Sequence, residues 1–199
     1  MDKKTIDAYN RLAKEYDGET IDFWKSFPES FISRFAELID GRVLNIGSGP
    51  GRDGLLLRKE GLEVVCLDAS EEMVRLSSEQ GLESVAGDFN NLPFPDGAFG
   101  GVWAYTSLLH IPKAEVAQPL AEIKRVLKND GIFALGMIEG GEELYYESSG
   151  MKEPRWFSFY TQEELEKLLH KNGFEILYFE DYKPGLKKKY LNFISKARG

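Results

Sequence analysis

Apolar residues near the start of the chain recur at intervals of three and four, the spacing of one helical face. The first stripe consists of Ile6, Tyr9, Leu12 and Tyr16, and the second of Phe31, Phe35 and Leu38. Ser26 and Glu29 have the spacing of a capping box, with Pro28 between them, and predict the start of the second helix. Asp40-Gly41 predicts its end. We therefore expect residues 1–40 to form a helical segment ahead of the main fold.

From residue 41 onward, short apolar runs alternate with amphipathic segments. Strands are predicted at residues 42–46, 63–67, 84–86, 100–104 and 132–137. Helices are predicted at residues 52–60, from Ser70 onward, and at 119–128 before a turn at Asn129-Asp130-Gly131. Strands that alternate with helices in this way form parallel sheets covered on both faces. The pattern therefore predicts an α/β fold with a doubly wound sheet.

The end of the chain has a different pattern. A capping box at Thr161 and Glu164 opens a helix that ends at Asn172-Gly173. Two strand-like runs follow at 174–180 and 190–197, and no helix lies between them. Such a short link joins only antiparallel neighbours, so we expect the sheet to finish with an antiparallel hairpin.

Composition narrows the class of protein. The 199 residues suit one domain, 1–199, and 13% aromatic residues supply a core. The net charge of −8 disfavours a nucleic-acid partner. The single cysteine, Cys66, excludes an internal disulfide framework and a zinc site built on several thiolates. No run reaches the roughly 18 apolar residues of a membrane span, so we expect a cytoplasmic protein with no membrane partner, either a monomer or a homodimer.

A glycine-rich loop, Gly47-Ser48-Gly49-Pro50-Gly51, follows the first predicted strand. In doubly wound sheets this turn faces the ligand crevice, and glycine lets the backbone approach a ligand closely. A tight turn without a ligand has the same sequence pattern, so the loop alone does not decide between the two.

Acidic residues end the next two predicted strands. Asp68 lies about 20 residues after the first glycine, where a carboxylate can accept hydrogen bonds from a ribose diol. Its structural alternative is a helix cap, for which Ser70 is better placed. Asp88 and Phe89 follow the third strand, where they suit an adenine amino group and ring, or a turn with a core aromatic. The loop, Asp68 and Asp88 are expected to converge on one crevice.

Together these residues resemble class I S-adenosylmethionine-dependent methyltransferases, and more narrowly the methyltransferase type 11 group. The resemblance lies in residues 43–51, the strand ending at Asp68, Gly87-Asp88-Phe89, Leu92-Pro93-Phe94 and Ile123–Lys128, with the last helix and strand similar from Phe159 to Phe174. It covers about residues 40–198 and implies a Rossmann-like core, 41–199, under the helical cover 1–40. It also implies the cofactor S-adenosylmethionine, the product S-adenosylhomocysteine, no metal, and a small-molecule methyl acceptor.

The resemblance also assigns roles to individual residues. Gly47, Ser48, Gly49 and Gly51 would border the methionine part of the cofactor, and Asp68 would bind the ribose hydroxyls. Ala69 and Met73 would lie near the adenosine, Asp88 would bind the adenine amino group, and Phe89 would lie beside the ring. Tyr105 would line the methyl-transfer site, and Tyr9 and Tyr16 would cover the cofactor from the amino-terminal helix.

Two alternative functions remain open. Asn45 stands where the family usually has Asp or Glu, which is the only sequence support for a cofactor- or partner-binding protein without turnover. A nicotinamide-dependent oxidoreductase would need a third glycine at position 52, which is Arg52. Asn129-Asp130-Gly131 replaces the commoner Pro-Gly-Gly, a turn variation.

The acceptor has to be inferred from the variable parts. His110, near the crevice, is the candidate base if the acceptor arrives protonated, and otherwise a structural histidine. Residues 139–159 form a long loop rich in acidic and aromatic side chains, which suits a lid over a neutral or cationic acceptor, or a solvated loop. Lys187-Lys188-Lys189 is interpreted as a charged hairpin tip. Trp103–Thr106 lacks the Asn/Asp-Pro-Pro-Tyr/Phe motif of base and glutamine methyltransferases.

Overall fold

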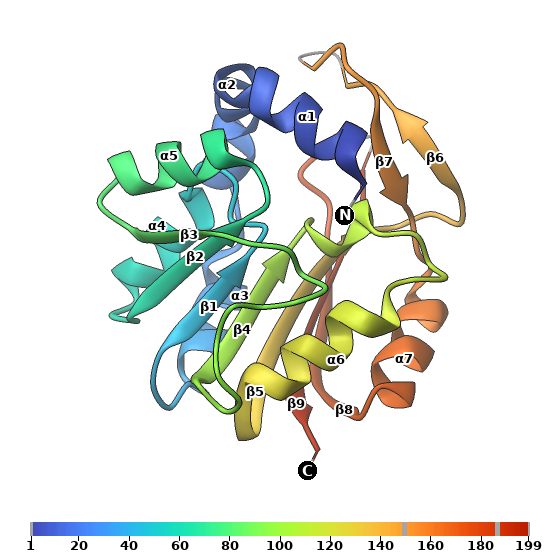
Figure 1. The fold of residues 1–199 in the computed structure, drawn as a ribbon. Helices are drawn as coiled ribbons and strands as arrows, with labels where there is room; N and C mark the ends of the chain where they lie inside the picture. The colour runs from blue at the N-terminus through green and yellow to red at the C-terminus, as the bar shows by residue number, and fades with distance from the viewer. Residues whose placement is uncertain (1, 149–150, 186–187, 199) are drawn as a thin grey trace.

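The computed structural model describes residues 2–148, 151–185 and 188–198. Its centre is a seven-stranded sheet with the order β3-β2-β1-β4-β5-β9-β8 (Figure 1). The strands are β1 (Val43–Ile46), β2 (Val64–Asp68), β3 (Glu83–Ala86), β4 (Phe99–Tyr105), β5 (Leu127–Ile138), β8 (Phe174–Tyr182) and β9 (Tyr190–Ala197). The five neighbouring strands β3, β2, β1, β4 and β5 are parallel, whereas β9 is antiparallel to both β5 and β8. The predicted mainly parallel sheet with an antiparallel carboxyl-terminal hairpin is confirmed.

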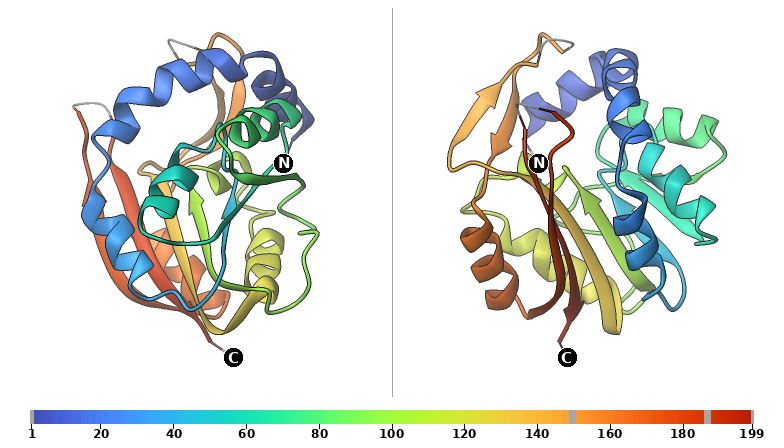
Figure 2. Two further views of the ribbon diagram at one scale, coloured as in Figure 1. Left: turned by 90° about the vertical axis from the view of Figure 1, so that its left-hand side faces the viewer. Right: turned by 180° about the vertical axis from the view of Figure 1, so that it is seen from behind.

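Helices cover both faces and the upper edge of this sheet. They are α1 (Lys3–Arg11), α2 (Ala13–Lys25), α3 (Glu29–Ala36), α4 (Arg52–Lys59), α5 (Glu71–Glu79), α6 (Ala117–Val126) and α7 (Gln162–Lys171), with a short 3₁₀ turn η1 (Leu108–His110). Figures 1 and 2 show α6 on one face and α3 on the opposite face. Helices α1 and α2 lie across the carboxyl ends of the parallel strands. The helical segment therefore covers the edge at which doubly wound sheets bind ligands.

Helix α3 packs on the middle of the sheet through an aromatic cluster. The rings of Phe31 and Phe35 lie 5.4 and 5.2 Å from that of Trp103 on β4. All three side chains are fully buried. A Cβ at Gly101 would come within 2.4 Å of Ile39. Glycine at this position therefore allows the helix to approach the strand closely.

Several local predictions were wrong. Ser26 is not the cap of α3 but ends α2, where its hydroxyl donates to the carbonyls of Asp22 and Phe23. Pro28 precedes α3 without a side-chain cap, and the helix ends at Ala36 rather than at Asp40-Gly41. Residues 129–131 lie inside β5 instead of a turn, with a positive φ of 61° at Asp130. Ser26 bonds to carbonyls within α2, and residues 128–131 lie at a register shift between the Leu127–Phe99 and Ile132–Gly101 pairs of β5 and β4.

Residues 139–159 are not a plain loop. They contain a two-stranded antiparallel hairpin, β6 (Glu143–Tyr146) and β7 (Arg155–Ser158). Two hydrogen bonds connect the hairpin to α1. The backbone N–H of Trp156 donates to the Thr5 hydroxyl at 2.9 Å, and the Arg11 Nε donates to the Glu153 carboxylate at 2.8 Å. Figure 1 shows α1 and the hairpin side by side above the strand ends.

Candidate functional site

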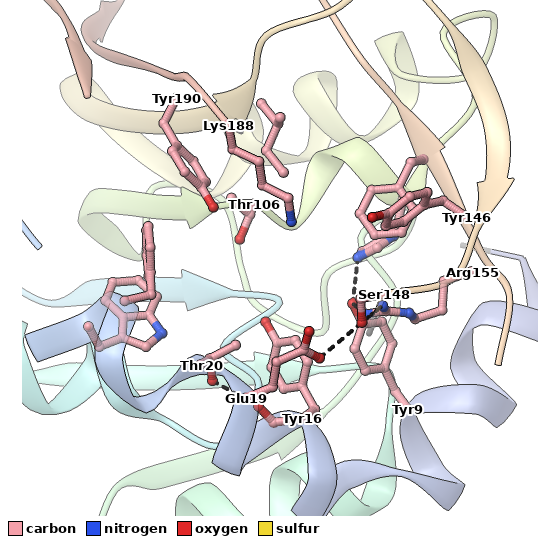
Figure 3. A pocket seen from close by; sticks show the side chains of 15 residues that line it. Tyr9, Tyr16, Glu19, Thr20, Thr106, Tyr146, Ser148, Arg155, Lys188 and Tyr190 are labelled. Carbon is pink, nitrogen blue, oxygen red and sulfur yellow. Dashed lines mark hydrogen bonds between the residues drawn. The ribbon is translucent and has the colours of Figure 1, made fainter. Parts of the chain in front are cut away.

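Two adjoining cavities lie beneath the amino-terminal helices, at the carboxyl ends of the strands. The inner cavity is bounded by the glycine loop, Asp68 and the end of β4. The outer cavity, of about 170 Å³, lies between α1, α2 and the hairpin (Figure 3). Tyr9, Tyr16, Thr106 and His110 line both. The two cavities therefore share a wall, and a group bound in one would face a group bound in the other.

The structure brings most of the predicted residues to the inner cavity. Those that line it are Tyr9, Tyr16, Gly47, Gly49, Asp68, Met73, Phe89, Tyr105 and His110. They come from eight different elements or loops, which converge only in the folded chain. The predicted roles of these residues belong to the function proposed below.

Asp68 is the buried carboxylate of the inner cavity. One oxygen accepts a hydrogen bond from the Gly49 N–H at 2.9 Å, and the other accepts one from the Ser70 N–H at 2.9 Å. A carboxylate offers about four lone-pair positions, so at least one remains for a ligand. Burial is the largest influence and raises the pKa of Asp68 to about 6, although backbone donors at Ser70, Gly49 and Ala69 oppose the shift.

The glycine loop has a backbone that a side chain would disrupt. Gly47 has a φ of +64°, and a Cβ there would come within 2.3 Å of the Ser107 Cβ. Gly49 has a φ of +51°, but its Cβ would meet only Tyr16, at 3.5 Å. The Ser107 hydroxyl beside Gly47 is buried and has no hydrogen-bond partner among the residues that the structure describes. Ser107 belongs to the wall of the inner cavity, and the hydrogen-bonding capacity of its hydroxyl is unused.

Four predicted ligands lie outside the walls of both cavities. Gly51 packs against Ser77 of α5 and against Leu82, because a Cβ there would lie 3.0 and 2.6 Å from them, and its φ of +88° suits the start of α4. Ser48 is buried beneath the loop, and Ala69 is half-buried beside Asp68. Asp88 is exposed and accepts hydrogen bonds from the Asn90 backbone and side chain. The convergence expected for the loop, Asp68 and Asp88 therefore holds for the loop and Asp68, with Phe89 in place of Asp88.

Asn45 does not reach the cavities but belongs to a buried network below them. Its Nδ2 donates to the Asp53 carboxylate at 2.8 Å, and the Trp103 Nε1 donates to the other oxygen at 3.1 Å. Burial raises the pKa of Asp53 to about 6. The acidic group missing from position 45 is therefore present eight residues later, on α4, in contact with the same side chain.

Replacing Asn45 by Asp would bring two buried carboxylates together. We expect Asn45→Asp to lower the free energy of unfolding by about 3 kcal/mol at pH 7.5, because one carboxyl must then hold a proton or repel its neighbour. The loss should shrink at pH 5.5, where a shared proton costs less. Chemical denaturation at both pH values measures this. The control Asn45→Asp/Asp53→Asn exchanges donor and acceptor and should recover part of the loss; no recovery would contradict the pairing.

His110 is held by hydrogen bonds at both ring nitrogens. Its Nδ1 lies 2.6 Å from the Trp156 carbonyl, which can only accept, so Nδ1 carries the proton. Its Nε2 therefore accepts from the Tyr9 hydroxyl, at 2.8 Å. The Tyr9 hydroxyl in turn accepts from Arg155, at 3.1 Å. Burial, the largest cause, lowers the pKa of His110 to about 3. A neutral His110 fixes Tyr9, and the structure favours this positioning role over the predicted base role.

Because His110 is buried in its neutral form, the stability of the protein should depend on pH. The native state binds fewer protons at this ring than the unfolded chain between about pH 3 and 6.5, so its contribution to stability falls as the pH is lowered. We expect the wild-type protein to lose about 2 kcal/mol more than His110→Gln between pH 7 and 5. Chemical denaturation of both proteins at each pH tests this. His170, exposed on α7, supplies the control variant His170→Gln; an equal loss in all three proteins would contradict a buried neutral His110.

Several residues of the site were missed by the sequence analysis. Thr106 has a positive φ of 51°, a strained position for a β-branched residue, and lines both cavities. Arg155 is buried at 3% exposure in the wall of the outer cavity. Glu19 and Lys188 line the same cavity. Nothing in their local sequence signals this, because α2 and the two hairpins bring them together.

The acidic residues of the predicted lid lie elsewhere. Glu142, Glu143 and Glu147 are exposed and do not line the outer cavity, whereas Tyr146 and Phe157 do. The charged lining consists of Glu19, Arg155 and Lys188. The lining of the outer cavity therefore does not support the expectation of a neutral or cationic acceptor, although Glu142 lines an adjoining hollow that shares Tyr146 and Lys188 with it. Of the predicted lysine cluster, Lys187 lies outside the described residues, and Lys189 forms an ion pair with Glu139.

Among the described residues, no group of three or more His, Cys, Asp or Glu side chains is arranged to hold a metal ion. No helix within the same ranges is long and apolar enough to cross a membrane. Cys66 is buried in β2, and burial raises the pKa of its thiol to about 12.

Comparison with known proteins gives one consistent family. A model described as a methyltransferase domain matches residues 44–135. Sarcosine/dimethylglycine N-methyltransferase of Halorhodospira halochloris is 31% identical over 76% of this chain and 57% of its own length. Malonyl-[acyl-carrier protein] O-methyltransferase of Geobacter sulfurreducens is 29% identical over 86% of this chain and 70% of its own length. The chain spans between 39% and 64% of the first three curated relatives that it matches.

Solved structures agree on the fold. The 1,6-didemethyltoxoflavin-N1-methyltransferase of Burkholderia thailandensis, solved with 1,6-didemethyltoxoflavin and S-adenosylhomocysteine bound, matches with a TM-score of 0.71. The alignment covers 98% of this chain and 88% of that chain, at 21% identity. At this identity the likeness concerns the fold.

Proposed function

The chain belongs to the class I S-adenosylmethionine-dependent methyltransferases, and we propose that it transfers a methyl group from this cofactor to a small molecule in the outer cavity. The observation that carries the proposal is the buried Asp68 carboxylate, held by the glycine loop in a cavity that shares a wall with a second one. A single cavity would support binding alone, whereas two that meet at Tyr9 and His110 suit transfer between two bound molecules.

The residues of the inner cavity fit the cofactor. Asp68 has acceptor positions free for the ribose hydroxyls, and Phe89 and Met73 offer apolar contacts for the adenine ring. The open Ser107 hydroxyl and the close backbone of Gly47 and Gly49 suit the methionine part. Asp88, Ala69, Ser48 and Gly51 remain proposed ligands on the family resemblance alone. When bound, the cofactor supplies a methyl group on a positively charged sulfur, with a good leaving group.

The chain itself has to align the acceptor and keep water out. Transfer to a nucleophile in line with the leaving sulfur needs positioning more than acid–base chemistry. Tyr9 is fixed by His110 and Arg155, and Tyr16 packs edge-on against it at 5.2 Å. Tyr105 is buried and donates to Asn192 at 3.0 Å. Aromatic faces of this kind stabilise a nearby cation without reacting with it.

Calorimetric titration with S-adenosylmethionine, S-adenosylhomocysteine and NADH tests the proposal. Saturable binding of the first two at one site, without NADH binding, is the expected result. Binding of NADH alone would favour the oxidoreductase alternative, in which Arg52 replaces the third glycine. Binding of the first two with no methyl transfer to any compound of a metabolite extract, followed with a labelled methyl group, would favour a binding protein without turnover.

A further inference from the structure

Arg155 is a buried cation that lacks an anionic partner. Only 3% of its surface is exposed. No ion pair joins it to a carboxylate within residues 2–148, 151–185 and 188–198. Buried charges in proteins are ordinarily paired, because removing an ion from water is costly. An arginine at this depth without a carboxylate is therefore a marker of a missing anion.

Its hydrogen-bonding capacity is also incompletely used. One terminal nitrogen donates to the Tyr9 hydroxyl at 3.1 Å and the other to the Ser148 hydroxyl at 3.1 Å. The Nε–H is buried and has no partner in the described part of the chain. Both partners are neutral, and an arginine offers five N–H donors. The guanidinium therefore retains donors and its full charge for a ligand.

A second cation enters the same cavity. Figure 3 shows the Lys188 side chain extending into the outer cavity from the segment before β9, with Arg155 entering from β7. Lys188 remains exposed to solvent, but partial desolvation, the largest effect, and the like charge of Arg155 lower its pKa, whereas Glu19 opposes the shift. Glu19 itself accepts from the Ser148 hydroxyl at 2.9 Å. Two cations therefore face one carboxylate, which leaves the cavity with an excess of positive charge.

Most of the remaining lining is aromatic. Phe23, Trp24, Phe157 and Tyr190 line the cavity together with Tyr146. A cavity of about 170 Å³ is comparable to the roughly 150 Å³ in which an apolar protein cavity holds benzene. The outer cavity thus combines space for a ring-sized apolar body with cationic donors at one side.

We propose that the outer cavity binds a small carboxylate-bearing acceptor with an apolar or aromatic body, and that Arg155, assisted by Lys188, holds the carboxylate. The assignment rests on the proposed methyl transfer for the identity of the acceptor, but the anion site itself does not depend on it. Arg155 also connects the ligand to Tyr9 and through it to His110. An acceptor without an anionic group would leave this cation unpaired.

Titration with three ring compounds of similar size tests the charge preference. Benzoate, benzamide and benzylamine are titrated by calorimetry into the protein saturated with S-adenosylhomocysteine. Benzoate is expected to bind at least tenfold more tightly than the other two. Arg155→Gln should lower the affinity for benzoate at least tenfold, and Lys188→Gln should lower it about threefold. Arg155→Lys should lower it less than Arg155→Gln does. Lys189→Gln is the matched control, since this lysine is paired with Glu139, and should leave benzoate binding unchanged.

Several outcomes would overturn the proposal. If benzamide or benzylamine binds as tightly as benzoate, the cavity does not prefer an anion. If the affinity for benzoate is unchanged in Arg155→Gln, Arg155 does not hold the carboxylate. If Arg155→Gln weakens S-adenosylhomocysteine as much as benzoate, Arg155 holds the cofactor's own carboxylate instead. Failure of S-adenosylhomocysteine to bind the wild-type protein contradicts the proposed function separately, and the same three titrations without it then test the anion site alone.

Discussion

Asp68→Ala is expected to weaken the binding of S-adenosylhomocysteine about 100-fold or more. A buried carboxylate that accepts two ribose hydroxyls makes charge-assisted hydrogen bonds worth about 1.5–3 kcal/mol each, and alanine cannot replace them. The two backbone donors at Gly49 and Ser70 would also lose their acceptor, which loosens the glycine loop. Calorimetric titration measures the affinity, and chemical denaturation shows whether the variant is folded.

The pH dependence of binding distinguishes the carboxylate's charge from its shape. With the pKa of Asp68 raised to about 6, lowering the pH from 7 to 5 protonates it in the free protein. If only the ionised form binds, affinity falls about tenfold per pH unit below 6. Asp68→Asn should bind weakly with little of this slope. Asp96, an exposed partner of Arg125 outside both cavities, gives the control Asp96→Asn. Unchanged affinity in both Asp68 variants would contradict the ribose role.

The sheet and its order of elements could be predicted because each strand carries its own signal. Buried parallel strands such as Val64–Asp68 are continuous apolar runs, and glycines mark their ends. The antiparallel ending followed from the short link alone. The hairpin β6–β7 could not be predicted in this way, because all four residues of Glu143–Tyr146 are exposed and their pattern has no buried face.

The two cavities of the candidate site also differ in how far the sequence predicts them. The inner cavity is built from strand ends, where residue type and position in the sequence already indicate a shared crevice, as with Gly47 and Asp68. The outer cavity depends on contacts between segments far apart in the chain. Arg155 resembles any arginine of a polar loop until Tyr9, 146 residues away, and Ser148 enclose it. The residues of the inner cavity could therefore be proposed from the sequence, whereas those of the outer cavity could not.

Gly47→Ala should have a much larger effect on stability than Gly49→Ala. Both residues have a positive φ, so both variants lose about 1–2 kcal/mol to backbone strain. At Gly47 the new methyl group would also lie 2.3 Å from the Ser107 Cβ and 3.1 Å from Phe89. Overpacking of a rigid core adds about 1–3 kcal/mol, so we expect a total loss of about 2–5 kcal/mol for Gly47→Ala.

This pair separates backbone strain from the close approach of the loop to Ser107, which precedes η1. Chemical denaturation of the two variants gives the difference in unfolding free energy, and Gly47→Ala/Ser107→Gly, which removes the Ser107 Cβ, should recover part of it. Equal losses for Gly47→Ala and Gly49→Ala would mean that the loop can move away from Ser107. The wall of the inner cavity would then be adjustable, and the ligand geometry at Gly47 would not be fixed by the fold.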